Sequence, residues 1–133
     1  MDYASKNHSK FLLICHLIFV CKYRKQLLVK LGEQIKIIFT VIARTQNINI
    51  VEMEVDKDHI HLLVQYNPTQ SILSIVRSFK QLSTYRIWRQ NDNQFYLRKH
   101  FWKEKTFWSD GYFSCSIGNV SREVIEQYIK SQG

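Results

Sequence analysis

The spacing of hydrophobic and polar residues changes several times along the 133-residue chain. Residues 11–21 form an almost unbroken apolar run, which is typical of a strand buried on both faces. From about residue 27 to residue 44 the apolar positions recur at helical spacing. Residues 48–55 and then 58–66 have the composition and alternation of two strands. The first half of the chain is therefore predicted to fold as strand, helix, strand, strand.

The second half begins with a turn and helix cap at Asn67-Pro68-Thr69. A second amphipathic helix is predicted from about residue 70 to residue 90. Residues 91–108 have no clean period and are expected to form a long loop, whereas residues 111–118 alternate as a fourth strand. A last helix over about 121–132 follows an N-cap in Asn119-Val120-Ser121.

The first six elements have the βαββαβ order of the ferredoxin-like (RRM-like) α+β fold. Right-handed crossovers would place both long helices on one face of an antiparallel sheet, with the first and third strands at its centre. The C-terminal helix would then be free to reach the other face. The length and the absence of a linker predict a single domain over residues 1–133.

Two histidines lie two residues apart on the third predicted strand. Because side chains alternate along a strand, His59 and His61 share one face, and Ile60, Leu62 and Val64 take the other. The two imidazoles would be about 7 Å apart along the strand. At that separation they can share one metal ion.

A two-residue turn at 56–57 would place Glu54 opposite His59 and Glu52 opposite His61. These carboxylates either orient the imidazoles for metal binding or are ordinary polar partners on an exposed face. The same register aligns the apolar residues of the two strands on one face: Val51, Met53, Val55, Ile60, Leu62 and Val64.

The last helix carries Val124, Tyr128 and Gln132 at spacings of four residues, so they line one stripe. A tyrosine and a glutamine one turn apart can therefore face the same metal site. Taken singly, a helical tyrosine is more often a packing residue and a near-terminal glutamine is more often solvated.

The net charge of +8 and the pI of about 9.5 favour a polyanionic partner, of which nucleic acid is the commonest. The alternative is a merely basic, soluble protein. Cys15, Cys21 and Cys115 are odd in number and form no CxxC pair, which argues against a disulfide framework or a cysteine zinc site. A reducing, cytoplasmic location fits this pattern.

The apolar run at residues 11–21 resembles a signal peptide only superficially. It contains His16, lacks a small-residue cleavage site and continues directly into Lys22-Tyr23-Arg24-Lys25. It is also too short to cross a bilayer. We therefore expect a buried strand and no membrane association.

Aromatic and cationic residues are interleaved over residues 91–108. This mixture suits single-stranded nucleic acid, because bases stack on rings and cations follow the phosphates. Alternatively, the aromatic residues fill gaps in the core. Five basic residues are candidates for phosphate contact: Arg77, Lys80, Arg98, Lys103 and Lys105.

Several of these residues carry a family resemblance. His59-Ile60-His61 looks like the HUH motif, and Tyr128 followed by Gln132 resembles the nucleophile helix of the small single-tyrosine HUH transposases of bacterial and archaeal insertion sequences. These proteins move their elements as single-stranded DNA. The segments 21–25 and 108–113 are also similar to parts of that family.

The resemblance implies roles for the matching positions. His59, His61 and Gln132 would bind a divalent metal ion, Mg²⁺ or Mn²⁺, and Tyr128 would be the nucleophile. It implies cleavage and rejoining of single-stranded DNA through a 5′-phosphotyrosine intermediate. DNA hairpins at the element ends would be the substrate. It also implies a homodimer in which the tyrosine helix of one subunit completes the site of the other.

Two other functions fit parts of the sequence. A non-catalytic, RRM-like binder of single-stranded nucleic acid would explain the charge and the aromatic residues, but it would not need the two histidines, Tyr128 and Gln132 to converge. A metal-dependent phosphodiesterase that uses water would need the histidines and leave Tyr128 a structural role.

Overall fold

A computed structural model describes residues 13–116 and 122–132, without the side chains of Arg122 and Ile125. The predicted lead-in, the first two residues of the first strand, the end of the fourth strand and the N-cap at 119–121 lie outside this part. The elements are β1 (Leu13–Val20), a short 3-10 helix η1 (Lys22–Arg24), α1 (Leu28–Thr45), β2 (Asn49–Val55), β3 (His59–Tyr66), α2 (Ile72–Arg89), α3 (Asn91–His100), β4 (Phe113–Cys115) and α4 (Arg122–Ser131).

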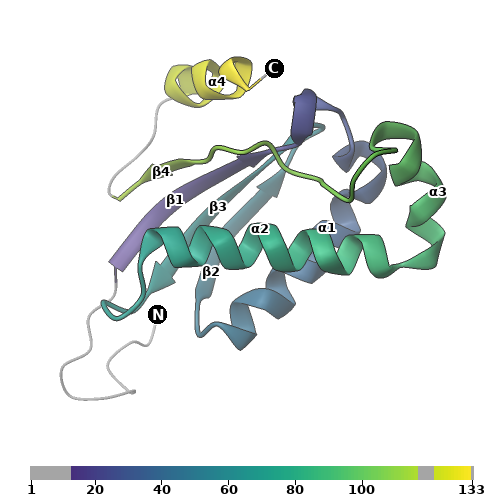
Figure 1. The fold of residues 1–133 in the computed structure, drawn as a ribbon. Helices are drawn as coiled ribbons and strands as arrows, with labels where there is room; N and C mark the ends of the chain where they lie inside the picture. Colours follow the sequence, from purple (N-terminus) through teal and green to yellow (C-terminus); the bar gives the residue numbers. More distant parts are fainter. Residues whose placement is uncertain (1–12, 117–121, 133) are drawn as a thin grey trace.

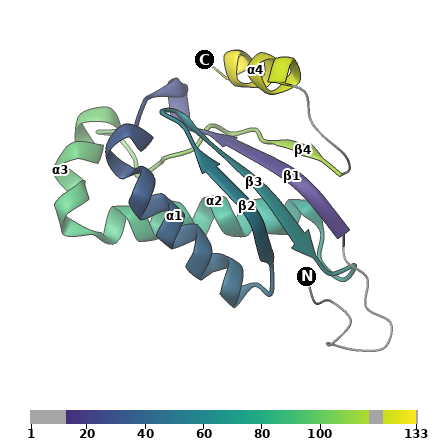
Figure 2. The same cartoon turned by 180° about the vertical axis from the view of Figure 1, so that it is seen from behind.

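The four strands form one antiparallel sheet in the order β2-β3-β1-β4. The predicted ferredoxin-like fold, with its first and third strands at the centre, is thus confirmed. Helices α1 and α2 cover one face of the sheet, and α4 lies on the opposite side (Figures 1 and 2). None of the helices in the described part of the chain is long and apolar enough to cross a bilayer.

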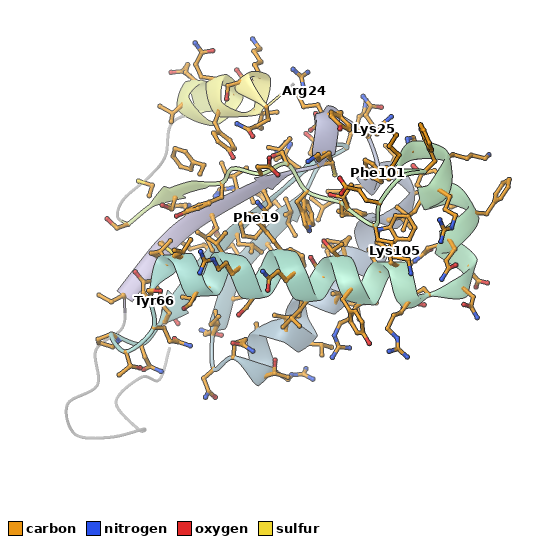
Figure 3. The ribbon with its side chains drawn as sticks, in the orientation of Figure 1. Phe19, Arg24, Lys25, Tyr66, Phe101 and Lys105 are labelled. Atoms are coloured by element: carbon orange, nitrogen blue, oxygen red, sulfur yellow. The ribbon has the colours of Figure 1, made fainter. Side chains whose placement is uncertain are left out.

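The main core lies between the sheet and the two long helices. Phe19 of β1 is fully buried there, and Figure 3 shows it on the side of the sheet that faces α2. The rings of Phe39 on α1 and Phe79 on α2 stack with their centroids 4.9 Å apart. Ile60 and Leu62 of β3 contribute to the same core, as the alternation along this strand predicts.

The β2–β3 hairpin differs from the predicted register by two residues. Val55 pairs with Ile60 and Glu54 with His61, because the two-residue turn lies one residue later than predicted, at 57–58, and closes with Asp56 N–H donating to the carbonyl of His59. A shift of two residues keeps each side chain on its predicted face. A bulge between Ile50 and Glu52 then displaces the rest of β2.

Two of the predicted positions on β2 differ, Glu52 through the shifted register and Val51 at the bulge. Glu52 pairs with Leu63 and not with His61. Val51 was expected on the apolar face, but its side chain is exposed. Bulges place an extra residue in one strand, which simple alternation along the sequence does not reveal.

The expected loop at 91–108 contains a helix, α3, so this prediction was wrong. The helix is held by polar contacts that hydrophobic periodicity does not detect. Buried Asn93 donates to Gln34 Oε1 over 2.7 Å and to the carbonyl of Ile87 over 3.1 Å. Asp92 lies in the first turn and three basic residues lie in the last, which complements the helix dipole.

Two element ends also differ from the sequence prediction. Helix α2 begins two residues later than expected, and its N-cap is Ser71, whose hydroxyl accepts from Ser74 N–H over 3.1 Å. The predicted cap at Asn67-Pro68-Thr69 precedes this residue. In the described part of the chain, β4 spans only three residues.

The two faces of β3 are expected to contribute unequally to stability. Leu62→Ala leaves a cavity in the core and should lower the free energy of unfolding by about 2–5 kcal/mol. His61→Ala, on the opposite face, should lower it by about 1 kcal/mol or less. Urea denaturation of both variants measures the difference, and equal losses would contradict this division of the sheet.

Candidate active site

The two histidines of β3 lie on the sheet face opposite the two long helices. Their side chains are about one fifth exposed, whereas Ile60 and Leu62 between and beside them are fully buried. The backbone around them is fixed on two sides. Cys21 N–H at the end of β1 donates to the carbonyl of Asp58, and Leu28 N–H donates to the carbonyl of Lys57. The imidazoles therefore project from a rigid part of the fold.

Each imidazole has a carboxylate beside its Nδ1 atom. His59 Nδ1 lies 2.9 Å from Asp58 Oδ1, and His61 Nδ1 lies 3.8 Å from Glu54 Oε1. A carboxylate at one ring nitrogen orients the ring and favours the lone pair on the other nitrogen, as in many metal sites. Glu54 thus lies near His61 rather than near the predicted His59. Asp58 was not among the predicted site residues.

Glu52 is more distant from this pair of rings. It pairs with Leu63 across the strands, and its negative charge only opposes the net lowering of the His61 pKa. Burial is the larger influence and lowers the pKa of His61 below its ordinary value. The imidazole of His61 is therefore more easily kept neutral, the form that binds a metal ion.

A third histidine, which the sequence analysis did not place in the site, lies next to His61. His16 Nδ1 is 3.0 Å from His61 Nε2, and the two rings stack with centroids 5.2 Å apart. The sequence of β1 does indicate the position of His16, because Cys15 and Leu17 belong to the main core and His16 alternates with them. A polar residue in an otherwise apolar strand marks the face that the long helices leave open.

Tyr128 of α4 lies over the β4 side of the sheet. Its ring packs on Phe113 with centroids 5.8 Å apart. Its hydroxyl is buried, with no hydrogen-bond partner among the described residues. Burial raises the pKa of Tyr128 to about 12. The phenol is therefore protonated at neutral pH in this position.

Gln132, one turn further along, contacts the segment that precedes β4. Its Oε1 accepts from Ser109 Oγ over 3.0 Å. At Gly111, a Cβ atom would lie 3.5 Å from both Gln132 Oε1 and Tyr128 Oη. The phenolic oxygen and the amide oxygen therefore lie close to the same residue, as the spacing of the tyrosine and the glutamine on the helix predicts.

The same segment connects α4 to the histidine strand. Ser109 N–H donates to the carbonyl of Val20 over 2.8 Å, and Val20 pairs with His59 across β1 and β3. Gln132 thus lies at the His59 end of the site. Within the described residues, no three His, Cys, Asp or Glu side chains are grouped closely enough to hold a metal ion.

Four of the predicted DNA-contacting residues are exposed: Arg77, Arg98, Lys103 and Lys105. Lys103 lies over the ring of Trp102, which is 73% exposed. Lys105 lines a cavity of about 650 Å³ between α2 and residues 105–110, at the end of the molecule where α3 packs (Figure 3).

The aromatic residues of 91–108 divide between the two proposed roles. Phe101, Phe107 and Trp108 are buried and fill the core, whereas Phe95 and Trp102 are exposed. Exposed rings beside cations are suited to stacking on bases. The core-filling role is thus confirmed for the buried rings, and contact with nucleic acid stays a prediction for the exposed ones.

Lys80 differs from the other cationic candidates. Its ammonium group is half-buried and donates to three consecutive backbone carbonyls, those of Ser109, Asp110 and Gly111. Burial lowers the pKa of Lys80, and the nearby Asp110 carboxylate opposes this shift. All three of its N–H donors are engaged within the protein.

Comparisons with known proteins identify the family of this chain. Residues 9–132 match the family model of IS200-like transposases, so the chain belongs to this family. It is 32% identical over 118 residues to the ISDra2 transposase TnpA of Deinococcus radiodurans, covering 88% of this chain and 81% of that protein. It is 28% identical over 134 residues to the transposase of insertion sequence IS200 from Salmonella typhimurium, covering 98% and 84%.

Two solved structures have a similar fold. A putative transposase from Deinococcus radiodurans superposes with a TM-score of 0.81 at 28% identity, over 99% of this chain and 98% of that one. A REP-associated tyrosine transposase bound to a REP hairpin has a TM-score of 0.55 at 15% identity, over 97% and 68%. The second likeness supports the fold alone.

The buried phenol of Tyr128 should make the seating of α4 sensitive to high pH. Because its pKa is about 12 when folded and about 10 when unfolded, its contribution to stability is present below pH 10 and is lost as the pH rises towards 12. Tyrosinate absorbance of the native protein minus that of Tyr128→Phe should show a midpoint near 12. A midpoint near 10 would mean that the phenol is exposed.

Proposed function

We propose that this chain is a single-tyrosine HUH transposase that cleaves and rejoins single-stranded DNA at insertion-sequence ends. One observation carries the proposal. Tyr128 Oη and Gln132 Oε1 converge at Gly111, on a segment bonded to the strand beside His59. The phenol and the amide oxygen thus lie together on a segment joined to the neighbour strand of the histidines, which supports a single site in a protein that belongs to a transposase family.

The reaction must keep the energy of the phosphodiester bond, because rejoining DNA has no other energy source here. A covalent intermediate on the protein keeps it. Tyr128 Oη attacks the scissile phosphorus, the phosphorus–O3′ bond breaks, and O3′ leaves as a hydroxyl group after gaining a proton. The phenolic proton is released to solvent. A 3′-hydroxyl can later reverse the step, because a phenol of pKa near 10 leaves far more readily than an alkoxide.

Tyr128 cannot perform this step where it now lies. Its hydroxyl oxygen is buried, so a phosphate cannot contact it in this position. We infer that α4 shifts when DNA binds, while the imidazoles stay in place on β3. The histidines would be the fixed half of the site and α4 its movable half.

The donor set fits a divalent cation. His59 and His61 each have a carboxylate near Nδ1, which favours Nε2 as the donor, and Gln132 supplies an amide oxygen. Because His61 Nε2 lies 3.0 Å from His16 Nδ1, a metal ion bound there would replace this contact. Mg²⁺ or Mn²⁺ bound there would supply positive charge to the phosphoryl oxygens. Because the three ligands are neutral, they would leave that charge undiminished, and imidazole ligation favours Mn²⁺.

DNA hairpins are the proposed substrate. The net charge of +8 and the exposed cations on α2, α3 and the 101–105 segment provide contacts for phosphates. Exposed Trp102 beside Lys103 suits an unpaired base. The name of the REP-associated relative also refers to a bound hairpin.

Tyr128→Phe should abolish the covalent protein–DNA adduct. Without the phenolic oxygen no phosphorus–oxygen bond to the helix can form. The measurement is a denaturing gel of the protein incubated with labelled single-stranded DNA that bears element-end hairpins, in Mg²⁺ or Mn²⁺. Tyr66→Phe is the matched control, because this tyrosine lies at the opposite end of β3 from His59 and should keep the adduct.

The same gel separates the competing functions. Cleavage without an adduct by the wild-type protein would favour hydrolysis by water, and binding without cleavage would favour a passive nucleic-acid module.

We also propose a homodimer with composite sites. Mixing His61→Ala chains with Tyr128→Phe chains should restore part of the adduct if α4 of one subunit serves the other.

Asp58→Ala should weaken metal binding without touching the proposed ligands. Losing the carboxylate at His59 Nδ1 should raise the dissociation constant for Mn²⁺ by about tenfold to a hundredfold. Electron paramagnetic resonance of free Mn²⁺ measures this constant in the absence of DNA. Asp56→Ala, an exposed carboxylate two residues away, is the control. Equal affinities for the two variants would contradict the role of Asp58.

A further inference from the structure

We propose that Lys80 is a positioning residue of the active site, which holds the 109–111 segment on which Tyr128 and Gln132 are seated. The inference rests on the proposed function for the roles of those two residues. Lys80 comes from α2, on the helix-covered face, and acts through the segment rather than by touching DNA.

The ammonium group of Lys80 makes a tripod of hydrogen bonds. Nζ lies 2.7 Å from the carbonyl oxygen of Ser109, 2.9 Å from that of Asp110 and 3.1 Å from that of Gly111. Three N–H donors are thus matched to three acceptors at normal hydrogen-bond lengths. Hydrogen bonds that involve a charged donor are about twice as strong as neutral ones.

The convergence of the three carbonyls is itself informative. In an extended strand, successive carbonyls point to opposite sides. Here three in a row point at one atom, so the backbone is curled around the ammonium group. Without a cation their dipoles would repel one another, and the segment would open towards an ordinary extended path. The conformation of residues 109–111 therefore depends on Lys80.

This segment is where the two halves of the site join. Ser109 bonds through its backbone to Val20, beside the histidine strand, and through its hydroxyl to Gln132. Gly111 lies against both Gln132 and Tyr128. A shift of the segment would move the third proposed ligand and the nucleophile together, relative to imidazoles that stay fixed.

Neighbouring anchors hold the chain before the segment. Trp108 Nε1 donates to Ser83 Oγ over 2.8 Å, and Trp88 Nε1 donates to the carbonyl of Thr106 over 2.9 Å. Within the segment, the carboxylate of Asp110 forms an ion pair with Lys22 at 3.4 Å, but the Asp110 side chain is 97% exposed. Such an exposed pair contributes little. Lys80 is thus the half-buried anchor of residues 109–111 themselves.

The test uses the full chain with Lys80→Met, which keeps the apolar stem and removes the donors. Amide hydrogen exchange of Ser109, which reports opening of the segment, should accelerate by about tenfold or more. The dissociation constant for Mn²⁺ should rise by about tenfold to a hundredfold. The rate of adduct formation at saturating DNA should fall by a similar factor, with hairpin affinity unchanged.

Lys80→Arg separates positioning from phosphate contact. Arginine keeps the positive charge, but its planar fork cannot direct three donors at three converging carbonyls. A positioning role predicts faster Ser109 exchange in both variants, with hairpin affinity and its salt dependence unchanged. A phosphate contact predicts normal exchange in both variants. For Lys80→Met alone, a phosphate contact predicts weaker hairpin binding. It also predicts that the slope of log binding constant against log salt concentration falls in magnitude by about one. That result would overturn the proposal.

Lys36→Met, on α1, is the control for the loss of one lysine charge, because Lys36 pairs with the exposed carboxylate of Glu33. It should leave exchange, Mn²⁺ affinity and adduct formation unchanged. Normal Ser109 exchange in both Lys80 variants would overturn the proposal regardless of activity. If the wild-type protein formed no adduct, the proposed function would fail. The exchange and Mn²⁺ measurements would still decide the role of Lys80.

Discussion

The antiparallel pairing of β1 with β3 is the interaction on which the rest of the structure depends. It runs from Leu13 opposite Tyr66 to Val20 opposite His59, at the centre of the sheet. Because side chains alternate, this one ladder presents an apolar face to the two long helices and the imidazoles to the opposite face. A slip of one residue would bury the histidines and expose the core, so folding and site assembly are coupled through the same register.

The second constraint is the junction formed by residues 108–111. It is bonded to β1 on one side, held by α2 on another, and contacts Tyr128 and Gln132 of α4. Among the described residues, the ring of Tyr128 also packs on Phe113. The imidazoles therefore project from the centre of the sheet, whereas the proposed nucleophile and third ligand are seated on a separate element.

Family membership and site geometry are separate lines of support. The match to IS200-like transposases rests on residues 9–132 and would hold whatever the side-chain arrangement. The roles proposed for His59, His61, Tyr128 and Gln132 rest on local contacts. Those contacts extend the site beyond its motif residues, to Asp58 at His59, Glu54 and His16 at His61, and Lys80 beneath the junction. Each of these acts on a neighbour through a hydrogen bond or a charge.

The sequence by itself determined the order of the elements, the central strands and the face on which the histidines lie, because these depend on hydrophobic periodicity and on the fixed alternation of strands. It also placed Tyr128 and Gln132 on one stripe, because helical spacing is equally regular. Only the tertiary structure decided the hairpin register, since the position of a turn and a bulge leave no periodic signal. The same holds for α3, which depends on a buried amide pair, and for the contacts of His16 and Lys80. Those contacts join residues 45 and about 30 positions apart in the chain, and packing alone brings them together.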